Sequence, residues 1–188
     1  MQPETLKIQT APMPVVKHIS SSHPIHPDTE TLIIGTFNPG TPENTADFFY
    51  GRRQNYLWRL LPMAFGKPDL KNASREDKLE FMNRHKIDFI DLIAEVNVEK
   101  GMEANYNDDY IDNLVIQWKD VISEMEKLKN LRKACFTRKT FSNVPNIWKK
   151  VLEIEKYCLS KEIDFKCLIT TSRVYSKAKQ HEWSQFFV

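Results

Sequence analysis

Apolar positions recur along the chain with two kinds of spacing. Short runs of consecutive apolar or β-branched residues, such as TLIIGT at 31–36, are typical of buried strands. Longer stretches place apolar residues three and four positions apart, which is typical of a helix with one buried face. Strands are expected at 31–36, 88–93, 134–137 and 166–171. Helices are expected at 55–65, 74–85, 109–129, 144–157 and 176–186.

Strands and helical segments thus alternate four times after residue 30. This order predicts the α/β class, as a three-layer α/β/α domain with a mostly parallel four-stranded sheet. Residues 1–30 are rich in Pro, Ser, Thr and His, and we expect an irregular N-terminal arm there. Residues 31–188 are then a single domain, because 188 residues suffice for one core without disulfides.

The loops at one edge of this sheet are the expected ligand site, because open parallel sheets bind ligands outside the carboxyl ends of their strands. The segments leaving those ends are 37–53, 95–107, 138–143 and 172–179. Three of the four belong to or adjoin clusters of basic residues, which predicts an anionic ligand at this rim. The acidic helix expected at 109–129 would lie in a covering layer, away from the rim.

The composition is that of an ordinary folded protein, with 41% hydrophobic and 28% charged residues and a net charge of +2. No apolar run approaches the ~20 residues that cross a bilayer, and residues 1–17 lack the apolar block of a secretory signal. Three cysteines suit a reducing compartment and form neither a zinc ribbon nor a four-cysteine cluster. We therefore expect a cytoplasmic monomer without membrane contact, cofactor or metal.

Several common chemistries have no matching motif here. The chain contains no GxxxxGK[ST] or GxGxxG phosphate loop and no GxSxG nucleophile elbow. His18, His23 and His26 lie close together, but their spacing is not that of a standard zinc motif, so they are expected to be exposed loop histidines.

The loop after the first strand carries the richest chemistry. A carboxamide there (Asn38) can position a water molecule without titrating. Aromatic side chains (Phe48, Phe49, Tyr50) offer faces for base stacking, worth ~1–3 kcal/mol per base. Arginine (Arg52) provides phosphate contacts. The alternative is that the aromatic residues plug the loop into the core, which we expect for at least one of the three.

These residues resemble the first motif region of the uracil-DNA glycosylase superfamily, most of all its mismatch-specific and hypoxanthine-DNA glycosylase branches. The resemblance is carried by LIIGTFNPG at 32–40, FYG at 49–51 and NYLWRLL at 55–61. Weaker similarity continues in CFTRKTF at 135–141 and TTSRVY at 170–175, so it covers about residues 20–188. Ile169 and Arg173 stand where the family's second motif has prolines.

The resemblance implies a catalytic amide, and two positions match. Asn38 matches the asparagine of the mismatch-specific branch that orients the attacking water, although this chain has one more residue after Gly35 than that branch. Asn55 matches the essential amide of the other branch. Both alternatives stay open at this point. The implied substrate-binding residues are Gly35, Thr36, Phe37, Phe49 and Tyr50, with Phe37 or Phe49 stacking on the extruded base.

The implied partner is DNA that contains a damaged base. The residues expected to contact it are Arg52, Arg53, Arg138, Lys139, Thr171, Ser172, Arg173, Tyr175 and Lys177. Arg173 and Tyr175 would stand at the tip that fills the vacated stack.

The implied activity is hydrolysis of the N-glycosidic bond of a flipped deaminated base, uracil or hypoxanthine, by a monofunctional DNA glycosylase. Two other readings stay open. One is a non-catalytic nucleic-acid-binding protein of the same fold, and the other is an α/β domain that acts on small phosphorylated metabolites.

Overall fold

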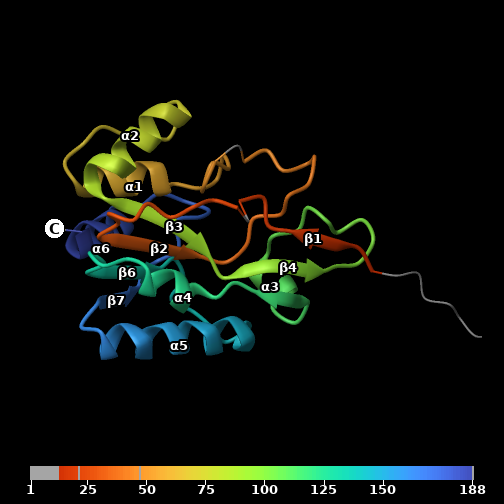
Figure 1. Ribbon diagram of the computed structural model, residues 1–188. Helices are drawn as coiled ribbons and strands as arrows, with labels where there is room; N and C mark the ends of the chain where they lie inside the picture. Colours follow the sequence, from red (N-terminus) through yellow and green to blue (C-terminus); the bar gives the residue numbers. More distant parts are fainter. Residues whose placement is uncertain (1–12, 21, 47, 188) are drawn as a thin grey trace, which may run out of the picture.

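The computed structural model describes residues 13–20, 22–46 and 48–187, and its centre is a parallel sheet (Figure 1). The sheet has four strands, all parallel, in the order β3-β2-β6-β7. The expected mostly parallel four-stranded sheet is therefore confirmed. Its strands are β2 (Thr31–Gly35), β3 (Ile87–Asp91), β6 (Lys133–Phe136) and β7 (Asp164–Cys167).

Helices cover both faces of this sheet, which confirms the three-layer architecture (Figure 1). One layer is made of α1 (Leu57–Ala64), α2 (Arg75–His85) and α6 (Lys177–Phe187). The other contains α4 (Val121–Glu126) and α5 (Pro145–Ser160). The central strand β2 is buried throughout and serves both layers, since Ile33 packs with Trp58 while Leu32 and Ile34 pack with the α5 side.

Local signals set where the helices begin and end. α2 starts with a capping box, in which the Ser74 side chain and Asp77 bond to each other's backbone N–H groups. It ends at Lys86, which adopts the left-handed conformation. α5 begins with Pro145 in its first turn, and Asp112 accepts hydrogen bonds from the N–H groups of Asn146 and Ile147.

A second, antiparallel sheet corrects two expectations. It consists of β1 (Val15–Lys17), β4 (Ile93–Asn97) and β5 (Val115–Trp118) in the order β1-β4-β5. Part of the segment 1–30, expected to be irregular, is thus a strand. The single helix expected at 109–129 is wrong, because that stretch forms α3 (Asp108–Ile111), β5 and α4.

The physical reason lies in β4. Only Leu92 separates β3 from β4, so the chain runs directly from the parallel sheet into the second one. β4 then pairs on both sides, with β1 and with β5. The apolar spacing of residues 111–118 fits a helix locally, but pairing with β4 overrides it. No helix in the described ranges is long and apolar enough to span a bilayer.

Candidate active site

The carboxyl ends of β2, β3 and β6 meet at one edge of the parallel sheet. Gly35 of β2 lies in register with Asp91 of β3, and the N–H of Thr137, just after β6, donates to the carbonyl of Ile34. A Cβ atom on Gly35 would overlap Asp91 Oδ1 and would lie 2.5 Å from the Tyr50 hydroxyl. Two functional groups therefore lie directly over Gly35, and glycine leaves the room for them.

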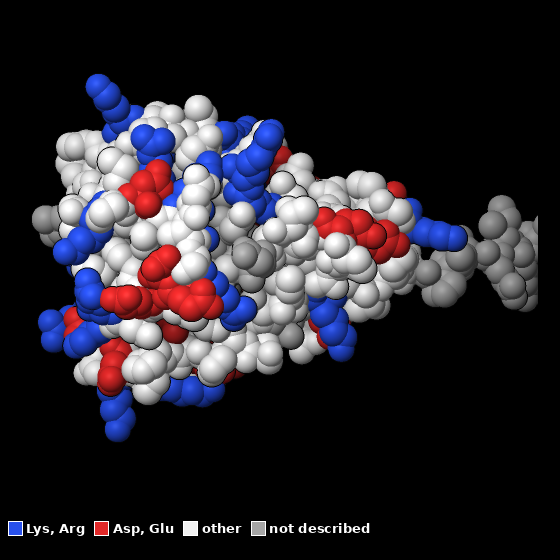
Figure 2. Space-filling model, turned by 90° about the horizontal axis from the view of Figure 1, so that it is seen from above, with Lys and Arg blue, Asp and Glu red and all other residues white. Residues whose placement is uncertain are grey.

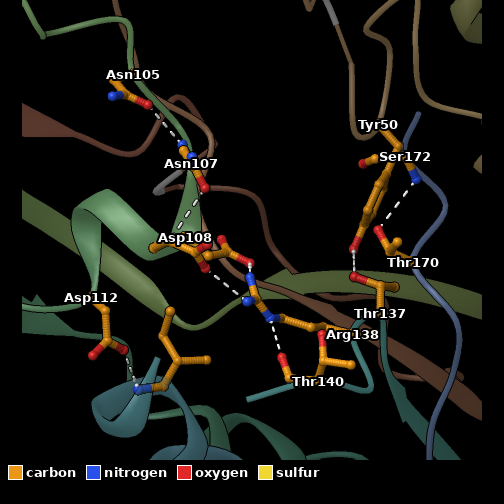
Figure 3. Close-up of polar contacts among 12 residues, drawn as sticks. Tyr50, Asn105, Asn107, Asp108, Asp112, Thr137, Arg138, Thr140, Thr170 and Ser172 are labelled. Carbon is orange, nitrogen blue, oxygen red and sulfur yellow. Dashed lines mark hydrogen bonds and ion pairs between the residues drawn. The ribbon is translucent and has the colours of Figure 1, made fainter. Parts of the chain in front are cut away.

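Tyr50 projects its hydroxyl group into this edge. The residue adopts φ 54°, a left-handed conformation that costs a non-glycine residue on the order of 1 kcal/mol or more, so the surrounding loop holds it there. Its hydroxyl lies 3.3 Å from Thr137 Oγ1 (Figure 3). Burial, together with the nearby Asp91 carboxylate, raises the pKa of Tyr50 well above its ordinary value. The hydroxyl is therefore a hydrogen-bond donor at neutral pH.

Asp91 is joined to the N-terminal arm by a histidine. His18 Nε2 lies 2.5 Å from Asp91 Oδ2, and His18 is only 2% exposed. Closer to the start of the same strand, His23 Nε2 lies 2.8 Å from Asp88 Oδ1. His18 and His23 are thus each paired with an aspartate of β3, which is an edge strand of the parallel sheet. The expectation of exposed loop histidines is wrong for His18, while His26 is exposed as expected.

Asn38 and Asn55, the two candidate amides, have different surroundings. The Asn38 side-chain oxygen accepts hydrogen bonds from Arg52 Nη2 at 2.6 Å and from Asn44 Nδ2 at 2.8 Å. The Asn55 side-chain oxygen accepts the N–H of Leu57 at 2.9 Å at the start of α1. Asn55 also pairs through its backbone with Ser172, so it ties the loop after β7 to the loop before α1.

Two acidic residues lie at the rim, and this corrects the expected placement of the acidic segment. Arg138 donates to Asp108 at 2.9 Å and to Asp109 at 2.8 Å (Figure 3). Burial raises the pKa of Asp108, although hydrogen bonds from Arg138 and Thr36 favour its charged form. The hydrogen bond from Arg138 lowers the pKa of the exposed Asp109. The acidic segment therefore reaches the rim of the site, because α3 at its start carries Asp108 and Asp109.

Half of the six expected phosphate-binding cations have partners within the chain: Arg52, Arg138 and Lys139. Arg52 is bound to Asn38 and stacks 3.4 Å above the ring of Tyr106, and Lys139 lies 3.0 Å from Glu182. On the face seen in Figure 2, basic and acidic side chains are interspersed. Three expected contact residues are exposed and have no ion-pair partner in the described part of the chain: Arg53, Arg173 and Lys177.

The aromatic residues differ from expectation in three places. Phe37 and Phe49 are both buried in the core, 6% and 5% exposed, so neither offers a free face to a base. Tyr175 packs against Tyr56 and lies under the guanidinium of Arg59 at 3.9 Å. The apolar side chain exposed in this loop is Val174, at 61%, next to the exposed Arg173, which adopts a left-handed conformation.

Three residues of the site were missed from the sequence: His18, Asp91 and Asp108. Asp91 was placed inside the expected strand 88–93, whereas β3 ends at this residue and so delivers its side chain to the edge. His18 carried no usable signal, because its partner lies 73 positions further along the chain. Among the described residues, no group of three or more His, Cys, Asp or Glu is arranged to hold a metal ion.

Comparison with known proteins gives one informative match. No protein-family model and no curated protein matches the chain. A solution NMR structure from Methanosarcina acetivorans, described as a candidate uracil DNA glycosylase, has a similar fold. The TM-score is 0.59 at 23% sequence identity, and the match covers 94% of each chain. At this identity the likeness establishes the α/β fold over nearly the whole chain.

Proposed function

We propose that the protein is a DNA glycosylase that hydrolyses the N-glycosidic bond of a flipped deaminated base, uracil or hypoxanthine. The single observation that carries the proposal is the group of side chains at the carboxyl edge of the sheet. A protonated phenol (Tyr50) and a buried carboxylate (Asp91) converge over Gly35, and a fixed amide (Asn38) lies three residues further along the same loop, in a fold shared with a candidate glycosylase.

The chemistry has two requirements that Tyr50 and Asn38 can supply. Cleavage of an N-glycosidic bond develops positive charge on the sugar, as in glycoside hydrolysis, and negative charge on the departing base. The Tyr50 hydroxyl stays protonated and can donate a hydrogen bond to the departing base. The Asn38 oxygen is fixed by Arg52 and Asn44, which leaves its Nδ2 hydrogens to contact the nucleotide.

Of the two candidate amides, we assign Asn38 to the site and Asn55 to the structure. Asn38 lies in the loop after β2, three residues after Gly35, over which Tyr50 and Asp91 converge. The oxygen of Asn55 is used at the start of α1, and its backbone holds Ser172. Asn55→Ala should therefore lower stability more than it lowers catalysis.

The enzyme is proposed to be monofunctional. A glycosylase with lyase activity needs a lysine amine at the sugar carbon. In the described ranges, no lysine amine forms a hydrogen bond or ion pair with Tyr50, Asn38 or Asp91.

The loop after β7 is the proposed contact with the DNA stack. A base inside a duplex must be extruded before it is reached, at a cost of a few kcal/mol. Val174, exposed at the tip of this loop, is placed to fill the vacated space, and the exposed cations Arg53, Arg173 and Lys177 are placed to contact the backbone. Tyr175 supports the loop from below, through Tyr56 and Arg59.

The deciding experiment uses labelled single- and double-stranded oligonucleotides that carry one uracil, hypoxanthine or xanthine. Alkali after incubation converts abasic sites to strand breaks. Breaks with any substrate, lost in Asn38→Ala and retained in folded Asn55→Ala, are the expected result. No breaks on any substrate would contradict the proposal.

One observation favours a second candidate, a nucleic-acid-binding protein without catalysis. Arg52, Arg138 and Lys139 all have partners inside the chain, so few cations remain to drive flipping. Salt-dependent binding without base release would support this candidate over the enzyme.

A further inference from the structure

We propose that Asp91 is a further catalytic residue of this site and that His18 is its positioning residue. Asp91 Oδ1 would take the proton of the water molecule that attacks C1′ of the flipped nucleotide. His18 would hold the carboxylate in the required orientation. This inference rests on the function proposed above and extends it to a residue to which the sequence analysis assigns no role.

The two oxygen atoms of the Asp91 carboxylate differ in their contacts: Oδ2 is hydrogen-bonded and Oδ1, within the described ranges, is not. Oδ2 is bound to His18 Nε2 at 2.5 Å. Oδ1 lies over Gly35 next to the Tyr50 hydroxyl, and it has no hydrogen-bond partner among the described residues. Asp91 is only 7% exposed, yet Oδ1 is not among the fully enclosed unpaired atoms. Buried polar atoms are nearly always bonded, so an accessible free oxygen here points to a ligand or water.

Other acceptors in the site are already occupied. The Asn38 oxygen receives hydrogen bonds from Arg52 and Asn44, which use both of its lone pairs. The carboxylate of Asp108 is held in an ion pair, because its Oδ2 accepts a hydrogen bond from Arg138 at 2.9 Å. Asp91 Oδ1 is therefore an acceptor with capacity left for a water molecule, beside the Tyr50 hydroxyl, and a carboxylate is a stronger base than an amide.

The hydrogen bonds of His18 indicate which of its ring nitrogens faces Asp91 as the donor. Nδ1 accepts the backbone N–H of Ser20 at 2.9 Å, so Nε2 carries the proton and donates it to Asp91. The ring is held edge-on to Phe37 at 5.7 Å between ring centres, and the backbone N–H of His18 donates to the carbonyl of Ala94. A rigid neutral imidazole thus orients one oxygen of Asp91 and leaves the other facing the site.

The charged and titratable groups around Asp91 come from several elements. They are His18 from the arm, Tyr50 and Arg52 from the loop after β2, and Lys119 from the end of β5. Arg52 and Lys119 therefore place positive charge beside the Asp91 carboxylate.

The proposed step is hydrolysis of the N-glycosidic bond, with Asp91 as the proton acceptor. The water oxygen forms a bond to C1′ while the bond from C1′ to the base nitrogen breaks, and its electron pair leaves with the base. One water proton passes to Asp91 Oδ1, and the second stays on the new sugar hydroxyl. The proton on Asp91 then passes to the departing base, directly or through solvent, which regenerates the carboxylate.

The first test is Asp91→Asn, which keeps an acceptor for His18 but removes the base. The single-turnover rate of base release should fall about 10²- to 10⁴-fold, with unchanged affinity for the DNA. Asp88→Asn is the matched control, because Asp88 lies on the same strand and is also bound to an arm histidine, His23. The rate of base release by Asp88→Asn should stay within a few-fold of the parent's rate, at temperatures below the melting point of the variant.

The second test separates positioning from packing at His18. His18→Gln can still donate to Asp91 from its Nε2 atom, whereas His18→Leu cannot. The glutamine variant should keep most of the rate and the leucine variant should lose it, without a matching difference in melting temperature. Equal rates in the two variants would overturn the positioning role.

The third test does not depend on hydrolysis. Oligonucleotides that carry a cationic pyrrolidine abasic analogue or a neutral tetrahydrofuran analogue are compared for binding. A carboxylate at C1′ should favour the cation in the parent protein, and Asp91→Asn should remove that preference while Asp88→Asn keeps it.

The outcomes distinguish this inference from the proposed function. Base release that survives Asp91→Asn overturns the inference and leaves the glycosylase standing. An absence of base release overturns the glycosylase, and the analogue preference then decides the placement of Asp91. A preference that is absent, or is unchanged in Asp91→Asn, overturns that placement, whereas its loss in Asp91→Asn supports it.

Discussion

The guanidinium of Arg138 lies 2.9 Å from the Asp108 carboxylate, at the rim where the sequence alone suggests a free phosphate contact. Its other terminal nitrogen is bound to Asp109, and its Nε donates to the carbonyl of Thr140 (Figure 3). A residue that resembles part of a DNA-binding motif is therefore engaged in holding α3 against the loop after β6.

This relationship predicts how each cation contributes to DNA binding. Arg173→Ala and Lys177→Ala should each reduce the slope of log affinity against log salt by about 0.9, because each removes one phosphate contact. Arg138→Gln should leave the slope unchanged, since Arg138 is neutralised within the chain. Fluorescence anisotropy across a salt series measures the slopes. An equal fall in Arg138→Gln would mean that the ion pairs open on DNA binding.

Gly35→Ala should damage the site more than the fold. The added methyl group would displace Asp91 Oδ1 and the Tyr50 hydroxyl, which are ends of side chains that can move. Overpacking of this kind costs about 1–3 kcal/mol in stability. Base release should fall by two orders of magnitude or more, because a misplacement of about 1 Å can cost ~10²-fold. Chemical denaturation and single-turnover assays on one preparation give both numbers, and retained activity would show that the two groups are not needed at Gly35.

The N-terminal arm should contribute to stability through Asp88. This carboxylate is 3% exposed and accepts hydrogen bonds from His23 and from the backbone N–H groups of His26 and Phe89. Asp88→Ala leaves these donors unpaired and should lower the free energy of unfolding by about 1–3 kcal/mol. Urea denaturation measures this loss. Asp28→Ala, at an exposed position of the same arm, should change stability little.

His85 should make stability depend on pH. Its ring packs between Phe65 and Phe81, with centroid distances of 4.4 and 4.5 Å. Burial, followed by the charges of Lys67 and Arg84, lowers the pKa of His85 below its ordinary value of 6.5. The unfolded state then binds more protons, so the stability that depends on a neutral ring is lost as pH falls below 6.5.

Melting temperatures measured between pH 5 and pH 8 test this sign, and a denaturation series in urea gives the same comparison. The parent should lose stability toward the acidic end, and His85→Leu should lose less of it. His181→Leu, at an exposed position on α6, serves as the control. An equal acid loss in His85→Leu and the parent would assign the effect to other groups.

Val174 should matter for paired DNA and not for single strands. Its side chain is exposed at the loop tip, where it can occupy the space left by an extruded base. Val174→Gly should slow base release from a duplex about tenfold or more while leaving release from a single strand unchanged, because flipping costs least in unpaired DNA. Comparable slowing on both substrates would place Val174 outside the flipping step.

The sequence by itself determined the main sheet and indicated the edge of that sheet at which we propose the site. The β2 run TLIIG is apolar on both sides because it lies in the middle of a parallel sheet, and such a run is visible in any local window. The alternation of strands with helices fixed the layers. The rule that ligands bind at carboxyl ends then pointed to the loops that hold Asn38, Tyr50 and Ser172.

Only the tertiary structure decided which side chains share that edge and which are already engaged. His18 reaches Asp91 across 73 positions, and residues 115–118 form a strand because β4 is beside them. Phe37 and Phe49 pack in two different hydrophobic clusters. Arg138 forms ion pairs with acidic residues of α3. Periodicity reports the burial of near neighbours, whereas these contacts depend on strand register and on packing between distant segments.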